Sequence, residues 1–198
     1  MSIPLRLDPA ARDRSHKLYL AACVLGMAAS ILQPWYLPSC LLFALTALVL
    51  GASSFLIRKY HRHLGKAWKT ALVCAVVYVL MPVLEPYGFK LFLTLGSVLS
   101  LYLCVMFALG GYVKALAGGT DEEELFRPPQ AAVWFEYCAC VYALAYLVAD
   151  AFPALDFVMT VAAMVSMGFG FAQLLIAFNK LAPDSQTQTA WQTELAGL

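Results

Sequence analysis

Residues 91–113 read LFLTLGSVLSLYLCVMFALGGYV and contain neither a charged residue nor a proline. A helix needs about 20 apolar residues to cross the hydrocarbon core of a bilayer. This stretch is long enough to do so, and it predicts a transmembrane helix. The fold class of the whole chain then depends on how many similar stretches accompany it.

The composition of the whole chain favours a membrane protein. Of its 198 residues, 62% are apolar and only 13% are charged, whereas about a quarter of the residues are charged in an ordinary soluble domain. This balance excludes a water-soluble globular protein. The 13 Lys and Arg residues nearly balance the 12 Asp and Glu residues, so the chain lacks the basic excess of a nucleic-acid-binding domain. The expected partner is the lipid bilayer, and no nucleic acid is expected.

Further apolar runs lie between the charged residues and prolines, and they bring the number of expected spans to six. The predicted spans are residues 18–37, 38–57, 67–84, 91–113, 131–149 and 155–179. They predict an all-α polytopic membrane protein in which three helical hairpins form one transmembrane domain, residues 18–180. Residues 1–17 are then an N-terminal segment, and residues 181–198 are a polar C-terminal tail.

The beginning of the chain has features of both a helix start and a secretory signal. Basic residues up to Lys17 precede an apolar run, but the run continues into the second span without a small-residue cleavage site, so we expect a retained helix. Asp8 followed by Pro9 is typical of a helix cap and first turn. We therefore expect a short surface helix from Pro9 to Lys17, ahead of the first span.

The distribution of basic residues predicts the orientation. If the six spans are correct, every Lys and Arg except Lys90 falls on one side of the membrane. Basic residues concentrate in cytoplasmic loops, so both termini are predicted to be cytoplasmic, in a plasma (inner) membrane. Basic residues next to a span also contact anionic lipid headgroups. The residues expected to do so are Arg58, Lys59, Arg62, Lys66 and Lys69.

Small residues spaced four apart predict how the helices pack. In lipid, such residues allow two helix backbones to approach closely. The clearest stripe lies on the fourth span and consists of Gly96, Ser100, Cys104 and Ala108. On the same span, Val98 and Val105 are expected to face lipid. Similar stripes occur on the first span (Ala22, Gly26, Ser30), the second (Ala44, Ala47, Gly51, Ser54) and the sixth (Ala162, Ser166, Gly170).

Three hairpins raise the question of an internal repeat. A Cys occurs early in the first helix of each hairpin, at Cys23, Cys74 and Cys138. The hairpins could be three copies of one unit, or the chain could consist of two inverted halves, as in many transporters. The sequence leaves both alternatives open.

One run matches a catalytic motif but lies in the wrong context. Residues 122–127, EEELFR, match the EExxxR motif of the intramembrane proteases that process prenylated proteins. Those enzymes also need later histidines within their spans, and this chain has no histidine after His63. The run lies in a polar loop between glycines and prolines. We interpret it as a solvated acidic linker.

The remaining reactive residues predict no cofactor, no metal and no catalytic constellation. His61 and His63 are two apart, so on a helix they would point to nearly opposite faces, and we expect them to meet water and lipid phosphates. The six cysteines form no CxxC pair, and we expect buried thiols to act as small apolar groups.

Two polar residues within the spans are candidates for an intramembrane polar site. Glu136 lies near the inner end of the fifth span, and Gln173 lies about two turns inside the sixth. An ionisable group inside a span is costly and is by default a functional candidate. The two side chains could line one internal cavity. The alternative is that Glu136 reaches the membrane interface and pairs with a neighbour such as Lys180.

Three classes of function stay open. A small transporter or a substrate-binding membrane subunit fits six spans in 198 residues, a size similar to that of the substrate-capture subunits of vitamin importers. A non-catalytic membrane interaction or regulatory protein fits the short loops and small-residue stripes equally well. An intramembrane enzyme without a recognisable motif is the third class. Other membrane subunits or a second copy of the chain are the protein partners that these classes suggest.

Overall fold

The chain is an all-α polytopic membrane protein. The computed structural model describes residues 8–117 and 129–181, and the regular secondary structure in these ranges is entirely helical. The long helices are α1 (Pro9–Ile31), α2 (Tyr36–Leu56), α3 (Arg62–Leu84), α4 (Lys90–Ala117), α5 (Gln130–Ala151) and α6 (Asp156–Lys180). Short 3₁₀ helices η1 (Arg58–Tyr60), η2 (Glu85–Tyr87) and η3 (Pro153–Leu155) lie in three of the connections. Five helices, α2 to α6, are long and apolar enough to cross a membrane.

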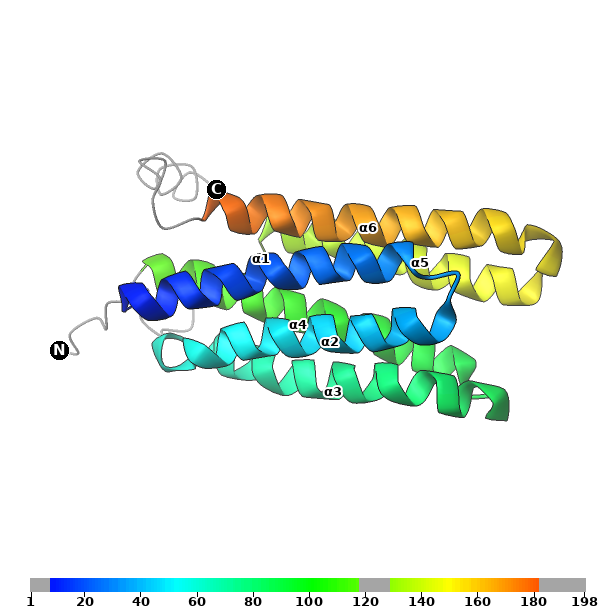
Figure 1. Cartoon of the computed structure of the whole chain (residues 1–198), viewed down its shortest axis with the longest axis horizontal. Coiled ribbons are helices and arrows are strands. Elements are labelled where there is room, and N and C mark those ends of the chain that lie inside the picture. The colour runs from blue at the N-terminus through cyan, green and yellow to red at the C-terminus, as the bar shows by residue number, and fades with distance from the viewer. Residues whose placement is uncertain (1–7, 118–128, 182–198) are drawn as a thin grey trace.

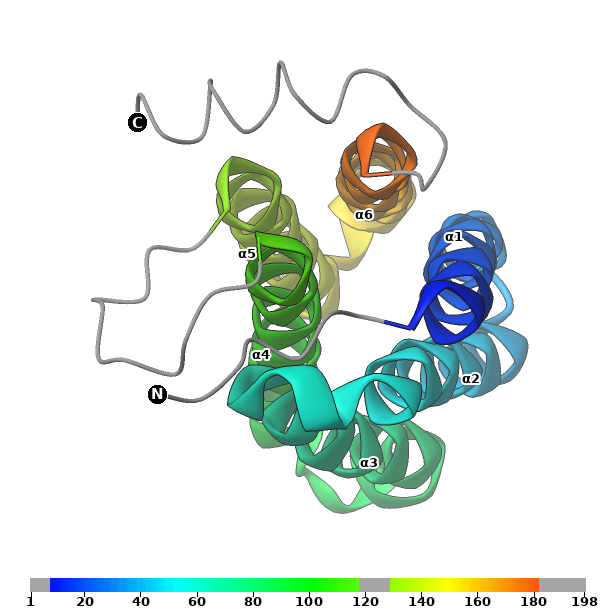
Figure 2. The same ribbon diagram turned by 90° about the vertical axis from the view of Figure 1, so that its left-hand side faces the viewer.

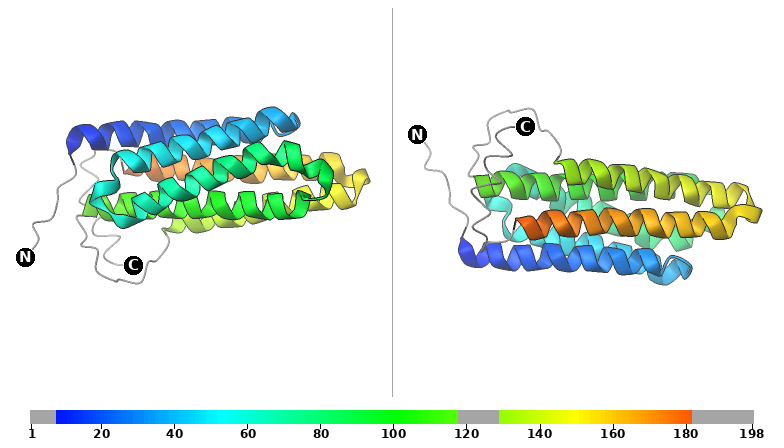
Figure 3. Two further views of the ribbon diagram at one scale, coloured as in Figure 1. Left: turned by 90° about the horizontal axis from the view of Figure 1, so that it is seen from below. Right: turned by 90° about the horizontal axis from the view of Figure 1, so that it is seen from above.

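The helices run along one common axis and form a closed ring (Figures 1 and 2). Consecutive helices contact each other, and α1 also packs against α6, which closes the ring. Figure 3 shows the same pairing of α1 and α6 from the side. Among these neighbouring pairs, the contact between α4 and α5 is the least extensive.

The two ends of the bundle differ in what they carry (Figure 1). The α1–α2, α3–α4 and α5–α6 connections lie at one end, which we call the hairpin end. The beginning of α1, the α2–α3 connection and the end of α6 lie at the other, which we call the terminal end. Each of the three pairs is therefore a helical hairpin, as the sequence predicts.

Glycines permit the closest approaches between helices. A Cβ atom built at Gly26 of α1 would collide with the Phe171 ring of α6, and one built at Gly51 of α2 would lie 2.6 Å from the Ala71 Cβ of α3. Such contacts are tighter than real Cβ atoms allow. Close backbone packing is a main source of helix association in lipid, where the hydrophobic effect between helices is lost. These glycines therefore help to set the order of helices around the ring.

Hydroxyl groups add hydrogen bonds between α1 and α2. The Ser15 Oγ donates to the backbone oxygen of Ser53 at 2.9 Å, and the Tyr19 hydroxyl lies 2.9 Å from Ser54 Oγ. All four residues are buried. A buried polar group needs such a partner, because it has lost its hydrogen bonds to water. The hydrogen bonds fix the register of α1 on α2 near the terminal end.

The prediction for the beginning of the chain needs a correction. Residues Pro9 to Lys17 do not form a separate surface helix, because they are the first part of the continuous helix α1. The predicted cap is confirmed: Asp8 Oδ1 accepts a hydrogen bond from the backbone N–H of Ala10 at 3.4 Å. With the cap in place, the sequence offers no proline or glycine before Gly26 to interrupt the helix.

The first predicted span, 18–37, is also corrected. The helix ends at Ile31 and a turn precedes α2, because Pro34 disfavours helical backbone at the residue before it. From Leu18 to Ile31 a helix covers only roughly 20 Å at 1.5 Å per residue. The hydrocarbon core is about 30 Å thick, which explains why α1 is not among the candidate membrane-spanning helices.

Candidate binding pocket at the hairpin end

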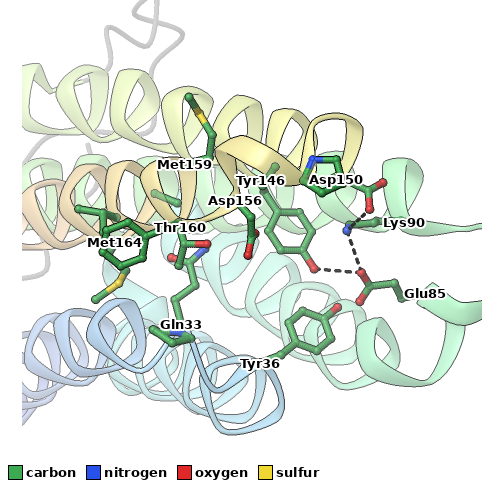
Figure 4. Close-up of a pocket in the computed structure, with 16 residues that line it drawn as sticks. Gln33, Tyr36, Glu85, Lys90, Tyr146, Asp150, Asp156, Met159, Thr160 and Met164 are labelled. Atoms are coloured by element: carbon green, nitrogen blue, oxygen red, sulfur yellow. Dashed lines mark hydrogen bonds and ion pairs between the residues drawn. The ribbon is translucent and has the colours of Figure 1, made fainter.

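A pocket of about 840 Å³ lies at the hairpin end, between the α1–α2 connection on one side and α5 and α6 on the other. Figure 4 shows it with its polar side chains. The wall combines charged, aromatic and amide groups with methionines. The residues that the text uses are Gln33, Tyr36, Glu85, Lys90, Tyr146, Asp150, Asp156, Phe157, Met159, Thr160 and Met164.

The pocket follows from the unequal lengths of the hairpins. The α5–α6 hairpin extends beyond the α1–α2 connection (Figure 1), because α1 already ends at Ile31. The first turns of α6, from Asp156 to Met164, therefore line the pocket. The proline-containing connections, with Pro34 and Pro153 in the wall, keep the chain short there and leave the space open.

An ion-pair cluster forms one side of the pocket. The Lys90 Nζ lies 2.7 Å from Asp150 Oδ1 and 3.3 Å from Glu85 Oε1. The Tyr146 hydroxyl donates a hydrogen bond to the same Glu85 oxygen at 3.1 Å. The Lys90 ammonium also lies 4.7 Å from the centre of the Tyr146 ring. These contacts join the α3–α4 hairpin to the end of α5, as the dashed lines in Figure 4 show.

Two polar atoms of the wall are buried without a hydrogen bond. They are the Tyr36 hydroxyl, which lies near Glu85 and Tyr146, and Gln33 Oε1. The Tyr36 and Tyr146 rings are nearly parallel, with centroids 6.3 Å apart. Buried polar atoms nearly always have a partner in folded proteins. Both atoms belong to residues that line the pocket, so a polar group inside it is a natural partner for them.

The net charge of the wall is negative. Its carboxylates belong to Glu85, Asp150 and Asp156, and its only ammonium belongs to Lys90. Lys90 is shared by the first two carboxylates. Among the described residues, Asp156 has neither an ion pair nor a side-chain hydrogen bond. Its side chain is drawn on the pocket side of α6 in Figure 4.

The structure places Glu136 and Gln173 in different surroundings. Glu136 on α5 is half-buried, and its carboxylate lies near the Tyr102 hydroxyl of α4. Gln173 on α6 lines a second pocket of about 300 Å³ near the terminal end, together with Trp134 and Lys180. Glu136 is not among the residues that line this pocket. Gln173 thus lines a pocket that Glu136 does not line, and a polar site shared by the two residues stays a prediction.

The predicted packing stripe on α4 is only partly a close contact. Ser100, Cys104 and Ala108 are buried, whereas a Cβ built at Gly96 would have no atom within 4 Å. The tight approach on α4 is instead at Gly111, where a Cβ would lie 2.9 Å from Leu64 Cγ of α3.

The expectation that Val98 and Val105 face lipid is wrong, because both are buried. The helix α4 contacts α2 as well as its ring neighbours α3 and α5. It therefore buries a wider face than a single stripe of small residues. A stripe identifies one contact face of a helix but does not show whether a second helix covers another.

The histidine pair is also arranged differently from the prediction. His61 has an extended backbone and precedes α3, and its Nδ1 accepts a hydrogen bond from the His63 N–H at 3.2 Å. The two rings are stacked 4.8 Å apart and both residues are buried. The helix geometry behind the prediction does not apply to a capping residue. Within residues 8–117 and 129–181, no cluster of three or more potential metal ligands occurs.

The predicted headgroup residues lie at the terminal end around the α2–α3 connection. Arg58 and Lys59 are on η1, and the other three lie on α3. All five side chains are exposed, and the Arg58 guanidinium lies 3.7 Å from the centre of the Phe55 ring. Their contact with headgroups stays a prediction. The EEELFR run and most of the C-terminal tail lie outside the described residues.

Sequence reasoning missed the hairpin-end pocket. The charge distribution singles out Lys90 as the one basic residue on its side, but it does not connect Lys90 with Glu85, Asp150 and Asp156. A signal was available, because the six spans predicted from the sequence place all four charges at one end of the bundle. Their pairing across the sequence depends on how each hairpin is rotated, which the sequence pattern does not determine.

Comparison with protein-family models, with curated proteins and with solved structures gave no match. The chemistry of the pocket is therefore the basis for any assignment of function.

Proposed function

We propose that the protein binds a small solute in the hairpin-end pocket, as a small transporter or as the substrate-binding subunit of a larger membrane assembly. The observation that carries this proposal is the pocket of about 840 Å³, with its half-buried ion-pair cluster. Ligand pockets commonly have volumes of about 300–1,000 Å³ and combine an apolar lining with a few polar groups.

Polar groups deeper in the bundle support transport in particular. The Tyr78 hydroxyl of α3 and Thr94 Oγ1 of α4 are buried and form no hydrogen bond. Next to them, the Phe43 ring stacks on Tyr78 at 5.1 Å and on Phe171 at 6.2 Å. A polar solute that passed from the pocket into the bundle would find hydrogen-bond partners in such hydroxyl groups.

The proposal includes an orientation. The hairpin end faces the outside of the plasma membrane and both termini are cytoplasmic, because Lys90 is the only basic residue at the hairpin end whereas the terminal end is rich in them. The pocket then takes its solute from outside the cell.

A second candidate function is that of a membrane interaction protein. It is favoured by the limited contact between α4 and α5, where the Tyr102 hydroxyl and the Glu136 carboxylate lie near each other. A polar pair at a loose helix contact offers hydrogen bonds to a helix of another membrane protein. In this case the partner is another membrane subunit or a second copy of the chain.

Filling the pocket with a large side chain tests the solute-binding proposal. The protein in lipid nanodiscs is heated with single solutes from a panel of amines, amino acids, carboxylic acids and sugars. We expect one class to raise the thermal midpoint of the wild type, because a ligand that binds only the folded state stabilises it. The effect should vanish in Thr160→Trp, which fills the pocket, and persist in Val165→Trp, whose position on the same helix is 65% exposed.

Two results would contradict the proposal. One is that no solute stabilises the wild type. The other is that Thr160→Trp and the wild type respond equally, which would place the binding site elsewhere. The first result would leave the interaction protein as the better candidate, and the oligomeric state of the purified chain would be the next measurement. The second would overturn the assignment of the solute site to this pocket.

A further inference from the structure

The chemistry of the pocket assigns a class of solute, and this assignment rests on the proposed function. We infer that the hairpin-end pocket takes an organic cation, in which an ammonium or a similar positive group is attached to an apolar body. The inference uses the charges of the wall, the position of Lys90 and the aromatic and thioether groups around it.

The first step is the charge balance. Three carboxylates and one ammonium line the pocket, so its wall carries a net charge of about −2 when all four groups are ionised at neutral pH. Lys90 neutralises part of the charge on Glu85 and Asp150. The exposed Asp156 carboxylate has no ion pair with any described residue. An anionic solute would have Lys90 as its only cationic partner and would be repelled by three carboxylates.

The second step is that Lys90 already shows how an ammonium fits here. Its Nζ lies between two carboxylates and over the face of the Tyr146 ring, at 2.7 Å from Asp150 and 4.7 Å from the ring centre. Carboxylates and aromatic faces are the groups that hold ammonium ions in proteins. A ligand cation finds the same groups on the pocket side, with Asp156 added.

The third step concerns the rest of the wall. Gln33 Oε1 is a hydrogen-bond acceptor without a partner. Phe157, Met159 and Met164 provide apolar and polarizable surface, and methionine adapts its shape to different ligands. The wall is therefore rich in acceptors and soft apolar groups. This combination suits a cation that is too large and too apolar to be a metal ion or a bare ammonium.

A pair of ions with the same shape and opposite charge tests the inference. Tetraphenylphosphonium and tetraphenylborate are both tetrahedral and apolar, and they differ mainly in the sign of their charge. Binding of each ion to the protein in phosphatidylcholine nanodiscs is measured by equilibrium dialysis, and uptake by empty nanodiscs is subtracted. We expect the protein to bind the phosphonium at least about tenfold more tightly than the borate.

Two variants show whether the binding occurs at this pocket. Asp156→Asn should weaken phosphonium binding about tenfold, because it removes the unpaired charge. Asp13→Asn is the matched control: Asp13 is a partly exposed carboxylate at the terminal end, where it pairs with Lys17 at 2.7 Å, and its loss should change nothing. Lys90→Gln should strengthen phosphonium binding, because it frees two carboxylates. A purely structural role of Lys90 would instead weaken it.

The outcomes distinguish a failure of the cation assignment from a failure of the proposed solute-binding function. If the borate binds as tightly as the phosphonium, or an uncharged or anionic solute of the panel binds while the phosphonium does not, the cation assignment is overturned and solute binding stands. Equal effects of Asp156→Asn and Asp13→Asn would also overturn it. If neither ion nor any solute binds, the proposed function itself fails.

Discussion

One methyl group at position 26 would disturb the contact that closes the ring. Alanine in place of Gly26 would put its Cβ into the ring of Phe171. That ring has little freedom to move, since it is fully buried and packs against Phe43 and Phe135. Overpacking of this kind costs about 1–3 kcal/mol. We therefore expect Gly26→Ala to lower the thermal midpoint of the protein in detergent.

The matched control for this change is Gly96→Ala. A Cβ at Gly96 has no atom within 4 Å, and alanine has a higher helix propensity than glycine. Gly96→Ala should leave the midpoint unchanged or raise it. Equal decreases in the thermal midpoint of the two variants would mean that the close approach of α1 to α6 is not an important constraint on stability.

His16 gives the stability of the protein a pH dependence. The residue is buried at the beginning of α1, where its Nδ1 lies 3.4 Å from the Tyr112 hydroxyl. Burial lowers the pKa of His16 below its usual value, and the nearby Arg12 cation lowers it further, while Asp13 partly opposes both effects. The folded state therefore binds fewer protons than the unfolded state once the pH falls below about 6.5.

The sign of the effect follows from this difference in bound protons. Stability rises with pH wherever the unfolded state binds more protons, so it should fall as the pH decreases from about 7 to 5. In His16→Gln, the thermal midpoint should fall less steeply over the same range, because this titration has been removed. A slope as steep as that of the wild type would show that His16 does not contribute.

At the scale of elements, the contact between α4 and α5 depends on few polar interactions. The Tyr102 hydroxyl lies near the Glu136 carboxylate where α4 and α5 make their least extensive contact, and we expect the two groups to share a hydrogen bond. Hydrogen bonds between membrane helices contribute about 0.6 kcal/mol on average. We expect Tyr102→Phe and Glu136→Gln each to destabilise the protein by about this amount. The double variant should lose less than the sum, when unfolding is measured in detergent and analysed as a double-mutant cycle.

A control on the same helix makes this measurement specific. Tyr137 is the next residue along α5 and is 62% exposed. Tyr137→Phe combined with Glu136→Gln should give additive effects. If the Tyr102 cycle is additive as well, the hydrogen bond does not hold α4 and α5 together, and the polar pair would be better explained as a contact for another membrane protein.

At the scale of the whole molecule, the topology can be tested with single cysteines. Tyr87 is a suitable position for the hairpin end, because it is 75% exposed. The neighbouring Gly88 is less suitable, since its φ of 86° is left-handed and disfavours other residues. With the six native cysteines replaced, Tyr87→Cys should react with an impermeant thiol reagent from outside the cell. Lys59→Cys should react only from the cytoplasm.

The contradicting result is that both cysteines react from the same side. In that case α3, which lies between the two positions, does not cross the membrane as described, and the predicted topology is wrong. Labelling from opposite sides but with Lys59→Cys outside would keep the spans and reverse the orientation. The pocket would then open toward the cytoplasm.

The sequence predicts the fold class more reliably than it predicts the contacts between the helices. Runs such as residues 91–113 identify helices because length and apolarity are local properties. Contacts are not local: the burial of Val105 depends on which helices surround α4, and the ion pair of Lys90 with Asp150 depends on how two hairpins are rotated toward each other. The end of α1 lies between these cases: Pro34 is a local signal for a turn, but where the helix stops ahead of it, at Ile31, also depends on packing.

The contact between α1 and α6 also determines when the ring of helices can close during synthesis. The ribosome makes α1 first and α6 last, although Gly26 and Phe171 must meet to close the ring. Translation proceeds at about 5–20 residues per second, so α1 waits several seconds or longer for its neighbour. During this time the face of α1 that carries Tyr19 and Gly26 is uncovered on that side. A chain that ended before α6 would leave that face of α1 open permanently. The nascent protein is therefore most prone to misassembly in the interval before its last helix is synthesised.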